Sequence, residues 1–252
     1  MSVLELKEIY KIFGSGHGHI ALKNINLVLD KGEFVAVMGP SGSGKTTLMN
    51  VAATVMKASS GKVIINGLDM EKLNKEKLAI MRREKIGFVF QDFRLIDNLN
   101  IEENIILPLV LNEVKANEID NKLNRLKDVL KLEDIVNKKS IYELSGGEKQ
   151  KVAIARAIIH EPAILFADEP TGKVDSNLTN NIMNLFKKIN KNFGMSIMMG
   201  THDPLSASFC DRVLFLKDGE IYNQIHKGEE KSDFYKRILD VIAFLGGSRY
   251  DF

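Results

Sequence analysis

The most specific chemical pattern in the chain is a glycine-rich stretch that ends in a lysine and a threonine. Residues 39–46 read GPSGSGKT and fit the pattern G-x-x-x-x-G-K-[ST]. They follow the apolar run FVAVM at 34–38, which predicts a strand buried on both faces, and an expected helix begins at Thr47. The residues predicted to bind the phosphates of a nucleotide are Gly39, Ser41, Gly42, Ser43, Gly44, Lys45, Thr46 and Thr47.

This pattern favours phosphate chemistry for two physical reasons. Glycines let backbone N–H groups surround an anion, and the start of the helix adds positive potential. Lys45 is expected to reach the β and γ phosphates, and the Thr46 hydroxyl to hold Mg²⁺. The alternative is a glycine-rich turn with a chance lysine, but strand, loop and helix follow one another as a phosphate-binding loop requires.

A pair of carboxylates follows a second apolar run. Residues 163–167 read AILFA, and Asp168 and Glu169 come next. Carboxylates are costly inside an apolar sheet, whereas at its carboxyl edge they face the ligand crevice. Asp168 is expected to bind Mg²⁺, directly or through water, and Glu169 to polarise an attacking water as a general base. The alternative is that these residues simply end a strand before Pro170.

A second glycine signature, LSGGE at 144–148, opens another expected helix. Ser145 and Glu148 have the spacing of a capping box, which explains those two residues. It does not explain Gly146 and Gly147, because adjacent glycines weaken the start of a helix. They are expected where the backbone approaches a phosphate closely. A single nucleotide does not need two such anion sites from one subunit.

Composition limits the classes of function. The chain has 252 residues, of which 44% are hydrophobic and 27% charged, as in ordinary globular proteins. The formal net charge of +2 argues against a dedicated nucleic-acid binder. Cys210 is the only cysteine, so no intrachain disulfide forms and a reducing compartment is expected. We interpret Cys210 as a small buried hydrophobe.

No stretch has the apolar length that a membrane span requires, about 20 residues. The run at 105–111 is short and contains Pro108. The first residues, MSVLELKEIYKIFG, lack the apolar core of a signal peptide. We therefore expect a cytoplasmic protein whose membrane role, if any, comes through a partner.

The elements needed to position these residues are visible as periodicities. Alternating apolar residues predict a strand at 25–29, and the strand at 62–65 ends in the turn pair Asn66-Gly67. The region of about 92–160 is expected to be an inserted helical subdomain, and about 231–252 a helical tail. The other expected elements are strands 86–90, 163–167, 195–200 and 212–216, a turn at Asp218-Gly219, and helices 117–132, 148–160, 178–190 and 233–245.

Taken together, these motifs resemble the ABC-type (ATP-binding cassette) ATPases. The resemblance implies an α/β P-loop NTPase fold of ABC ATPase type, with an N-terminal antiparallel β subdomain and an inserted α-helical subdomain, in one domain over 1–252. It implies ATP and Mg²⁺ as cofactors, with each ATP held between two cassettes that pack head to tail. The motifs that carry it are Gly39–Thr46, Gln91, Leu144–Glu148, Asp168-Glu169, Asp175 and His202.

The resemblance also implies roles that the residues alone leave open. Phe13 would stack on adenine, although it also suits a core position. Gln91 would contact Mg²⁺ or the attacking water, and His202 the γ-phosphate, although a strand-ending glutamine and a lone histidine are often structural. The implied catalytic residues are Glu169, His202 and Gln91. The implied metal ligands are Thr46, Gln91 and Asp168, and the implied contacts to the second cassette's nucleotide are Ser145, Gly146, Gly147, Glu148 and Asp175.

Three positions depart from the commonest family pattern. Glu148 replaces a frequent glutamine, Val174 a frequent leucine, and Gly200 precedes Thr201 where a branched residue is typical. The two latter changes are expected to affect strand packing near His202, and none changes the expected activity.

Within the family, residues 86–109 and the DEPTG run at 168–172 resemble the ATPases of lipoprotein release, macrolide efflux and cell division. The stretches 217–222, 234–235 and 245–247 resemble the Bce-type ATPases of bacitracin and antimicrobial-peptide resistance, although a generic amphipathic helix also explains this tail. The expected partners are a membrane permease, a second copy of the chain, and a sensor kinase through the permease, with no nucleic acid. The expected location is the cytoplasmic face of the cell membrane.

Two other functions stay open. A soluble ABC ATPase acting on DNA or ribosomes would carry a long coiled coil or two cassettes in one chain, and this sequence has neither. A regulatory clamp, in which the ATP state signals to a membrane partner with little transport, shares all the catalytic motifs.

Overall fold

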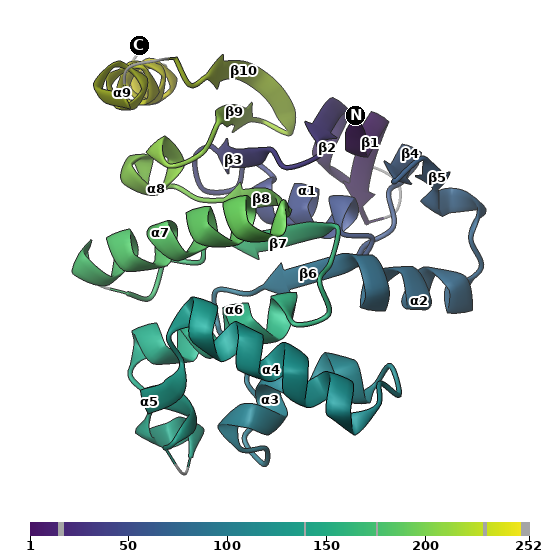
Figure 1. Ribbon diagram of the computed structural model, residues 1–252. Helices are drawn as coiled ribbons and strands as arrows, with labels where there is room; N and C mark the ends of the chain where they lie inside the picture. Colours follow the sequence, from purple (N-terminus) through teal and green to yellow (C-terminus); the bar gives the residue numbers. More distant parts are fainter. Residues whose placement is uncertain (15–17, 139, 175, 229–230, 248–252) are drawn as a thin grey trace. The chain divides into compact units, whose positions relative to one another are not determined.

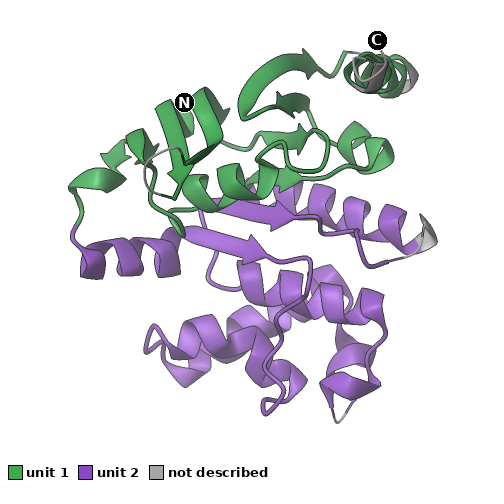
Figure 2. Cartoon of the chain, turned by 180° about the vertical axis from the view of Figure 1, so that it is seen from behind, with its two compact units in different colours: residues 1–73, 196–252 green, residues 74–195 purple. Residues whose placement is uncertain are grey.

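The structure, a computed structural model, describes residues 1–14, 18–138, 140–174, 176–228 and 231–247. The chain forms two compact units, one built from Met1–Leu73 with Ser196–Phe252 and the other from Asn74–Met195 (Figure 2). The expectation of a single domain with a helical subdomain at about 92–160 and a tail at about 231–252 stays a prediction.

The first unit is mostly β. Its elements, labelled in Figure 1, are β1 (Ser2–Phe13), β2 (His19–Asp30), β3 (Phe34–Met38), α1 (Lys45–Ala52), β4 (Ser60–Ile65), β5 (Leu68–Asp69), the 3₁₀ helix η1 (Met70–Lys72), β8 (Ser196–Gly200), α8 (Pro204–Ser208), β9 (Arg212–Lys217), β10 (Glu220–His226) and α9 (Lys231–Gly247).

An antiparallel sheet of order β2-β1-β4-β5 confirms the expected N-terminal β subdomain. Its alternating residues Ile25, Leu27 and Leu29 are buried, as the period of two predicts. The turn between β4 and β5 has positive φ at both Asn66 and Gly67, so the predicted turn pair is confirmed.

Four further strands of this unit pair in the order β10-β9-β3-β8. The strand β3 runs parallel to both β8 and β9, and all of its residues are buried. Its bounds are those predicted from the apolar run. The strands β9 and β10 form the hairpin expected around Asp218-Gly219.

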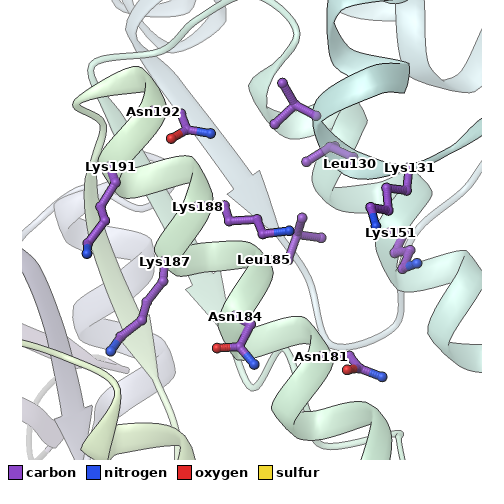
Figure 3. Close-up of a pocket in the computed structure, with 11 residues that line it drawn as sticks. Leu130, Lys131, Lys151, Asn181, Asn184, Leu185, Lys187, Lys188, Lys191 and Asn192 are labelled. Atoms are coloured by element: carbon purple, nitrogen blue, oxygen red, sulfur yellow. The ribbon is translucent and has the colours of Figure 1, made fainter.

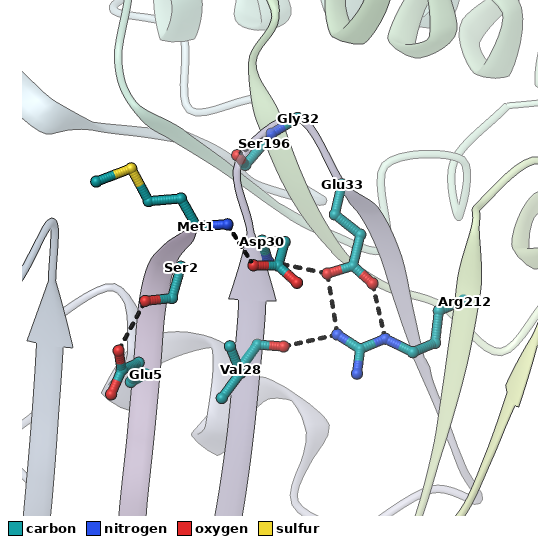
Figure 4. A network of polar contacts seen from close by, with 9 residues as sticks. All are labelled: Met1, Ser2, Glu5, Val28, Asp30, Gly32, Glu33, Ser196 and Arg212. Carbon is teal, nitrogen blue, oxygen red and sulfur yellow. Dashed lines mark hydrogen bonds and ion pairs between the residues drawn. The ribbon is translucent and has the colours of Figure 1, made fainter.

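A partly buried ion pair fixes the entry to β3 (Figure 4). Glu33, just before β3, binds the Arg212 guanidinium through both of its carboxylate oxygens, at 2.8 and 3.0 Å. The same guanidinium donates to the Val28 carbonyl of β2 at 2.6 Å, and the backbone N–H of Asp30 donates to Glu33. A planar guanidinium suits such convergent contacts. The network therefore joins β2, β3 and β9.

The second unit is mostly helical. Its elements are α2 (Lys75–Lys85), β6 (Ile86–Val89), α3 (Ile101–Val110), α4 (Ala116–Leu130), α5 (Glu133–Val136), the 3₁₀ helix η2 (Ile141–Glu143), α6 (Gly146–Ile158), β7 (Ile164–Asp168) and α7 (Ser176–Phe193).

The helices of this unit bury the faces that the sequence predicts. Leu123, Leu126 and Leu130 of α4 are buried, and so are Ile182 and Ile189 of α7. The helix α2 was not anticipated, because none of its residues is buried and no apolar stripe marks it. It begins instead with a polar cap, in which the Asn74 side chain accepts from the Lys77 backbone N–H.

The helix α3 continues through Pro108, where the sequence suggested an interruption. Asn104, fully buried on this helix, explains how the start of α3 is held. Its side-chain amide donates to the carbonyls of Ile96, Leu99 and Asn100 at 3.0 to 3.1 Å, and its oxygen accepts from the Ile96 N–H at 2.8 Å. A buried amide whose nitrogen and oxygen both have hydrogen-bond partners fixes the loop before α3.

The remaining helices agree with the sequence apart from their ends. The helix α6 starts at Gly146 rather than Glu148, because Ser145 acts as its N-cap. In α9 the side chains of Phe234 and Ile238 are fully buried. Cys210 is buried as expected. Across the described ranges, no helix is both long enough and apolar enough to cross a bilayer.

Candidate functional site

The glycine-rich stretch lies between β3 and α1, as predicted. The buried strand ends at Met38, and α1 begins at Lys45 with Gly44 as its N-cap. No side chain caps this helix, so its first backbone N–H groups are left to other partners. An anion at this point would satisfy them and would meet the positive end of the helix.

Two glycines of the loop stand where a side chain has no room. A Cβ on Gly39 would clash with the carbonyl oxygen of Leu216 in β9. A Cβ on Gly44 would lie 2.5 Å from the carbonyl oxygen of Ala21 in β2, and its φ of 103° also favours glycine. At these two glycines the loop therefore packs closely against β9 and β2.

The turn between β9 and β10 is hydrogen-bonded to the phosphate-binding loop. The N–H of Gly219 donates to the Ser43 carbonyl at 3.2 Å, and the N–H of Lys23 donates to the Gly219 carbonyl at 2.8 Å. The predicted hairpin turn therefore has a role that the sequence did not suggest, because it ties β2 to the phosphate-binding loop.

The polar side chains of the loop fit an anion and its cation. The Lys45 ammonium donates to the carbonyls of Gly39 at 2.8 Å and Pro40 at 3.0 Å, so it lies over the loop. The Ser43 hydroxyl is buried and lacks a hydrogen-bond partner among the described residues. Thr46 is exposed, which leaves its hydroxyl accessible.

His202 lies at the same edge of the sheet as the loop. It follows β8, whose Gly200 is level with Val37 of the parallel strand β3. The Thr201 N–H donates to the Val37 carbonyl, and Asp203 caps α8, so the chain on both sides of His202 is fixed. The imidazole itself is exposed.

Phe13 ends β1 in the same unit. Its ring is 40% exposed, which excludes the core position that the sequence left open. The Lys11 ammonium lies 5.1 Å from the ring centroid. An exposed aromatic ring at a strand end can stack on a flat ligand.

In the second unit, the parallel strands β6 and β7 bring the other polar groups to one edge. Phe88 is level with Phe166 and Val89 with Ala167, so Gln91 and Asp168 both follow at the carboxyl end. A Cβ on Gly172 would lie 3.2 Å from the Gln91 amide nitrogen and 3.4 Å from the Glu169 carbonyl oxygen. The Gln91 side chain therefore lies beside the loop that begins with Glu169.

Glu169 has an unusual backbone. Its φ of 49° is left-handed, a conformation that costs about 1–2 kcal/mol for a residue with a Cβ. Its carbonyl accepts from the Gly172 N–H at 3.1 Å, which closes a tight turn. Strain of this kind concentrates at functional sites, where the surrounding structure holds a side chain in one direction.

The segment after Gln91 is clamped by an arginine from α6. Phe93 and Arg94 both have positive φ, and their carbonyls accept from the Arg156 guanidinium at 2.8 and 2.7 Å. The Arg94 guanidinium in turn lies 3.9 Å from the centroid of the Phe90 ring. Burial lowers the pKa of Arg156, but the group stays charged at any physiological pH.

A second charged link joins the two strand-end loops. The Lys173 ammonium donates to the Asp92 carboxylate at 2.5 Å. This hydrogen bond lowers the pKa of Asp92, so the pair stays ionised down to acidic pH. Since Asp92 follows Gln91 and Lys173 follows Gly172, the contact holds the two loops side by side.

The helix α6 begins with the predicted capping box. Ser145 Oγ accepts from the Glu148 N–H, and Glu148 Oε2 accepts from the Ser145 N–H at 2.8 Å. Glu148 also binds the Lys138 ammonium at 2.6 Å, which with the backbone bond to Ser145 lowers the pKa of Glu148. Glu148 is thus engaged within its own chain.

The two glycines of this signature have different surroundings. A Cβ on Gly147 would lie 3.1 Å from a Leu178 methyl of α7, so packing gives one reason for that glycine. A Cβ on Gly146 would meet only the Lys173 carbonyl oxygen, at an ordinary 3.5 Å. The described residues of its own chain therefore leave room for a side chain at 146.

The residues fit Mg²⁺ held chiefly by a nucleotide. Within the described residues, no group of three or more His, Cys, Asp or Glu side chains is placed to hold a metal. Mg²⁺ commonly takes one or two protein ligands and completes its shell with phosphates and water. Each unit offers one ligand of that kind, the accessible Thr46 hydroxyl in the first and the strand-end carboxylate of Asp168 in the second.

The predicted residues are divided between the two units. The first unit holds Phe13, the loop 39–47 and His202, and the second holds Gln91, Asp168-Glu169 and 145–148. Asp175 lies outside the described residues. The roles of all these residues stay predictions.

Sequence reasoning missed the residues that support the site. Arg156 had a signal, because it is a single charge within the apolar run 152–159, and buried arginines need partners. Lys173 and Asp92 had none, because their contact joins residues 81 positions apart.

Comparisons with known proteins agree with this geometry. The model of the family described as "ABC transporter" matches residues 22–172. The ABC transporter ATP-binding protein YxdL of Bacillus subtilis is 46% identical over 99% of this chain and 97% of its own length. The bacitracin export ATP-binding protein BceA of Halalkalibacterium halodurans is 42% identical over the whole of both chains.

A solved structure is also similar. It is that of the cassette MJ0796 of Methanocaldococcus jannaschii, described as a dimer in a post-hydrolysis state bound to ADP and Pi. It has a TM-score of 0.81 and 39% sequence identity, and the match covers 89% of this chain and 99% of that one.

The surroundings of the two signature glycines give a stability prediction. Gly146→Ala is expected to leave the urea midpoint unchanged or raise it, because alanine favours the helix by up to about 1 kcal/mol. Gly147→Ala is expected to be less stable than Gly146→Ala by about 1 kcal/mol, because Leu178 must shift. Equal urea midpoints for the two variants would contradict this explanation of Gly147.

Proposed function

The chain belongs to the ABC transporter family as an ATP-binding, ATP-hydrolysing subunit, and on that basis we propose how its residues hold ATP and which permease it serves. The proposal is supported by the contrast between Gly146, where the chain leaves room for a side chain, and the loop 39–44, whose glycines and uncapped helix start suit an anion. Two anion sites on one chain are explained if each nucleotide lies between two copies.

The phosphate-binding loop of one copy holds the nucleotide. Lys45 neutralises the β and γ phosphates, the backbone N–H groups of the loop and of α1 surround them, and Phe13 stacks on adenine. Mg²⁺, held by Thr46, Asp168 and Gln91, supplies charge stabilisation for the phosphates when it is bound. The helix start at Ser145-Gly146-Gly147 of the second copy covers the γ-phosphate.

Glu169 and His202 act at the reacting end. The Glu169 carboxylate accepts a proton from the attacking water, whose oxygen forms the new bond to the γ-phosphorus while the bond to the ADP oxygen breaks. His202 donates a hydrogen bond to the γ-phosphate, and Gln91 positions the water. The left-handed backbone of Glu169 supports a fixed direction for its carboxylate.

Hydrolysis reaches the permease through the loop after Gln91. We propose that the permease docks near Gln91 and the helices α3 to α6, because Arg156 and the Lys173–Asp92 pair join that loop both to α6 and to the loop of Glu169. Closure of two copies on ATP would then move the permease, and hydrolysis would reset it.

The permease that we propose is of the antimicrobial-peptide resistance type. This rests on the full-length similarity to a bacitracin export ATP-binding protein and on the tail that resembles Bce-type ATPases. The subunit would then sit at the cytoplasmic face of the membrane through the permease. A sensor kinase that acts through the permease is the further partner proposed for such a system.

One test addresses catalysis. Glu169→Gln is expected to bind ATP but to lose turnover, because the amide cannot accept the proton, and so to accumulate as a dimer with MgATP. Size-exclusion chromatography with light scattering measures this, with Glu76→Gln on the exposed helix α2 as the matched control. Normal turnover in Glu169→Gln would contradict the assignment of the base.

A second test addresses the permease and its ligand. In the purified complex of this subunit with its permease, a bacitracin-like peptide is expected to raise the rate of ATP hydrolysis above the basal rate, because ligand and ATP sites are coupled. Peptide binding without any change in ATP hydrolysis would contradict peptide-coupled transport and favour a regulatory clamp.

A further inference from the structure

A lysine-rich pocket lies in the second unit, apart from every residue assigned above (Figure 3). Its volume is about 670 Å³, within the range of small-molecule sites. It is walled by the end of α4, by one side chain of α6 and by the outer face of α7. Its lining consists of Val129, Leu130, Lys131, Lys151, Asn181, Asn184, Leu185, Lys187, Lys188, Lys191 and Asn192.

The charge of this lysine pocket has one sign. Five of its lining residues are lysines, and no carboxylate is among them. Within the described ranges, four of these lysines take part in no ion pair, whereas lysines elsewhere on the same helices do, such as Lys127 with Glu102. Like charges gathered around a cavity repel one another, and a bound anion relieves that cost. The lysines without an ion pair are Lys131, Lys151, Lys188 and Lys191.

The lysines that line the pocket come from different elements. Lys131 follows α4, Lys151 lies on α6, and Lys188 lies on α7. In Figure 3 the Lys188 side chain points from α7 toward the side where Lys131 and Lys151 lie. Three separate elements therefore contribute lysines to the lining of one pocket, although in Figure 3 Lys187 and Lys191 point to the other side of α7.

Helix ends account for only part of this arrangement. Cations are favoured near the carboxyl ends of helices, which suits Lys131 at the end of α4 and Lys191 in the last turn of α7. Lys151 has no such reason, because it lies in the amino-terminal half of α6. Lys131 also has a φ of 54°, a cap conformation in which glycine is usual, so its side chain comes with a backbone cost.

The remaining lining suits a ligand larger than a single ion. The side chains of Asn181 and Asn184 offer hydrogen-bond donors and acceptors beside the lysines, and the buried Leu130 and Leu185 form an apolar surface. Ammonium groups bind phosphates as point charges, and a phosphate monoester carries up to two negative charges. Several lysines around one cavity are matched by several phosphates on one small molecule.

We propose that the lysine pocket binds a small polyanion with clustered phosphate groups. Such a ligand would bridge α6, whose N-cap is Ser145, and α7. Lys151 lies six residues after Ser145, about 9 Å along the helix axis, so the ligand would touch the signature helix without reaching the proposed nucleotide site. The pocket is thus a second phosphate site that does not depend on the function of the first.

The test uses the whole chain carrying Lys45→Ala, so that the phosphate-binding loop does not contribute to the measured binding. Isothermal titration with inorganic tripolyphosphate is expected to show binding in this background. Adding K131Q, K151Q and K188Q together is expected to weaken binding about tenfold or more, because three charge-assisted contacts are lost. The control carries K75Q, K77Q and K115Q, three exposed lysines of the same unit outside the pocket, and is expected to bind as before.

A single variant separates loss of binding from loss of folding. Lys131→Gly removes one ammonium group where glycine suits the backbone, so it is expected to weaken binding several-fold while keeping the urea midpoint or raising it. Vesicles that contain cardiolipin form a second arm. Binding to vesicles but not to tripolyphosphate, lost in the pocket variant, would identify a lipid headgroup as the source of the phosphates.

Three results would overturn the proposal. These are binding that Lys45→Ala alone abolishes, binding that falls equally in the pocket and control variants, and no binding in either arm. The first result would mean that the phosphate binds at the phosphate-binding loop. The second would mean that overall charge attracts it, and the third that neither site binds it.

Discussion

The rest of the site depends on how closely the backbone can approach a phosphate. A loop can surround an anion with N–H groups only where no side chain intervenes, and here the neighbouring strands enforce this. Carbonyls of Leu216 in β9 and Ala21 in β2 occupy the space that a Cβ on Gly39 or Gly44 would need. The antiparallel sheet and the hairpin of β9 and β10 therefore shape the loop as much as β3 and α1 do.

In the second unit, contacts made by charged side chains hold the site loops in place. The side chains of Gln91 and Glu169 would be poorly fixed by strands alone, since β6 ends at Val89 and β7 ends at Asp168. Arg156 holds the backbone after Gln91, and Lys173 with Asp92 joins the two loops. These contacts place the signature helix, the glutamine and the carboxylates within one connected network, which supports coupling between hydrolysis and a bound permease.

The parts of the fold and the site that depend on neighbouring residues could be predicted from the sequence. The continuous apolar run gave the bounds of β3, and the spacing of Ser145 and Glu148 gave the capping box, because both signals reside in neighbouring residues. Contacts between distant residues left no such signal, as with Lys173 and Asp92 or Gly219 and Ser43. The helix α2 escaped prediction because it buries no side chain. Gly147 also lies against Leu178, a packing reason for glycine that Gly146 does not share and that only the spatial neighbours reveal.

The central claim is that each ATP lies between the loop of one copy and the signature helix of another. Mixing two inactive variants tests it directly. Lys45→Ala disables the loop, and Gly146→Asp places a carboxylate where the γ-phosphate of the partner's nucleotide would lie, in a position with room for a side chain. A mixed pair keeps one complete site, so ATP hydrolysis is expected to rise on mixing well above that of either variant alone. No gain in hydrolysis when the two variants are mixed would contradict a shared site.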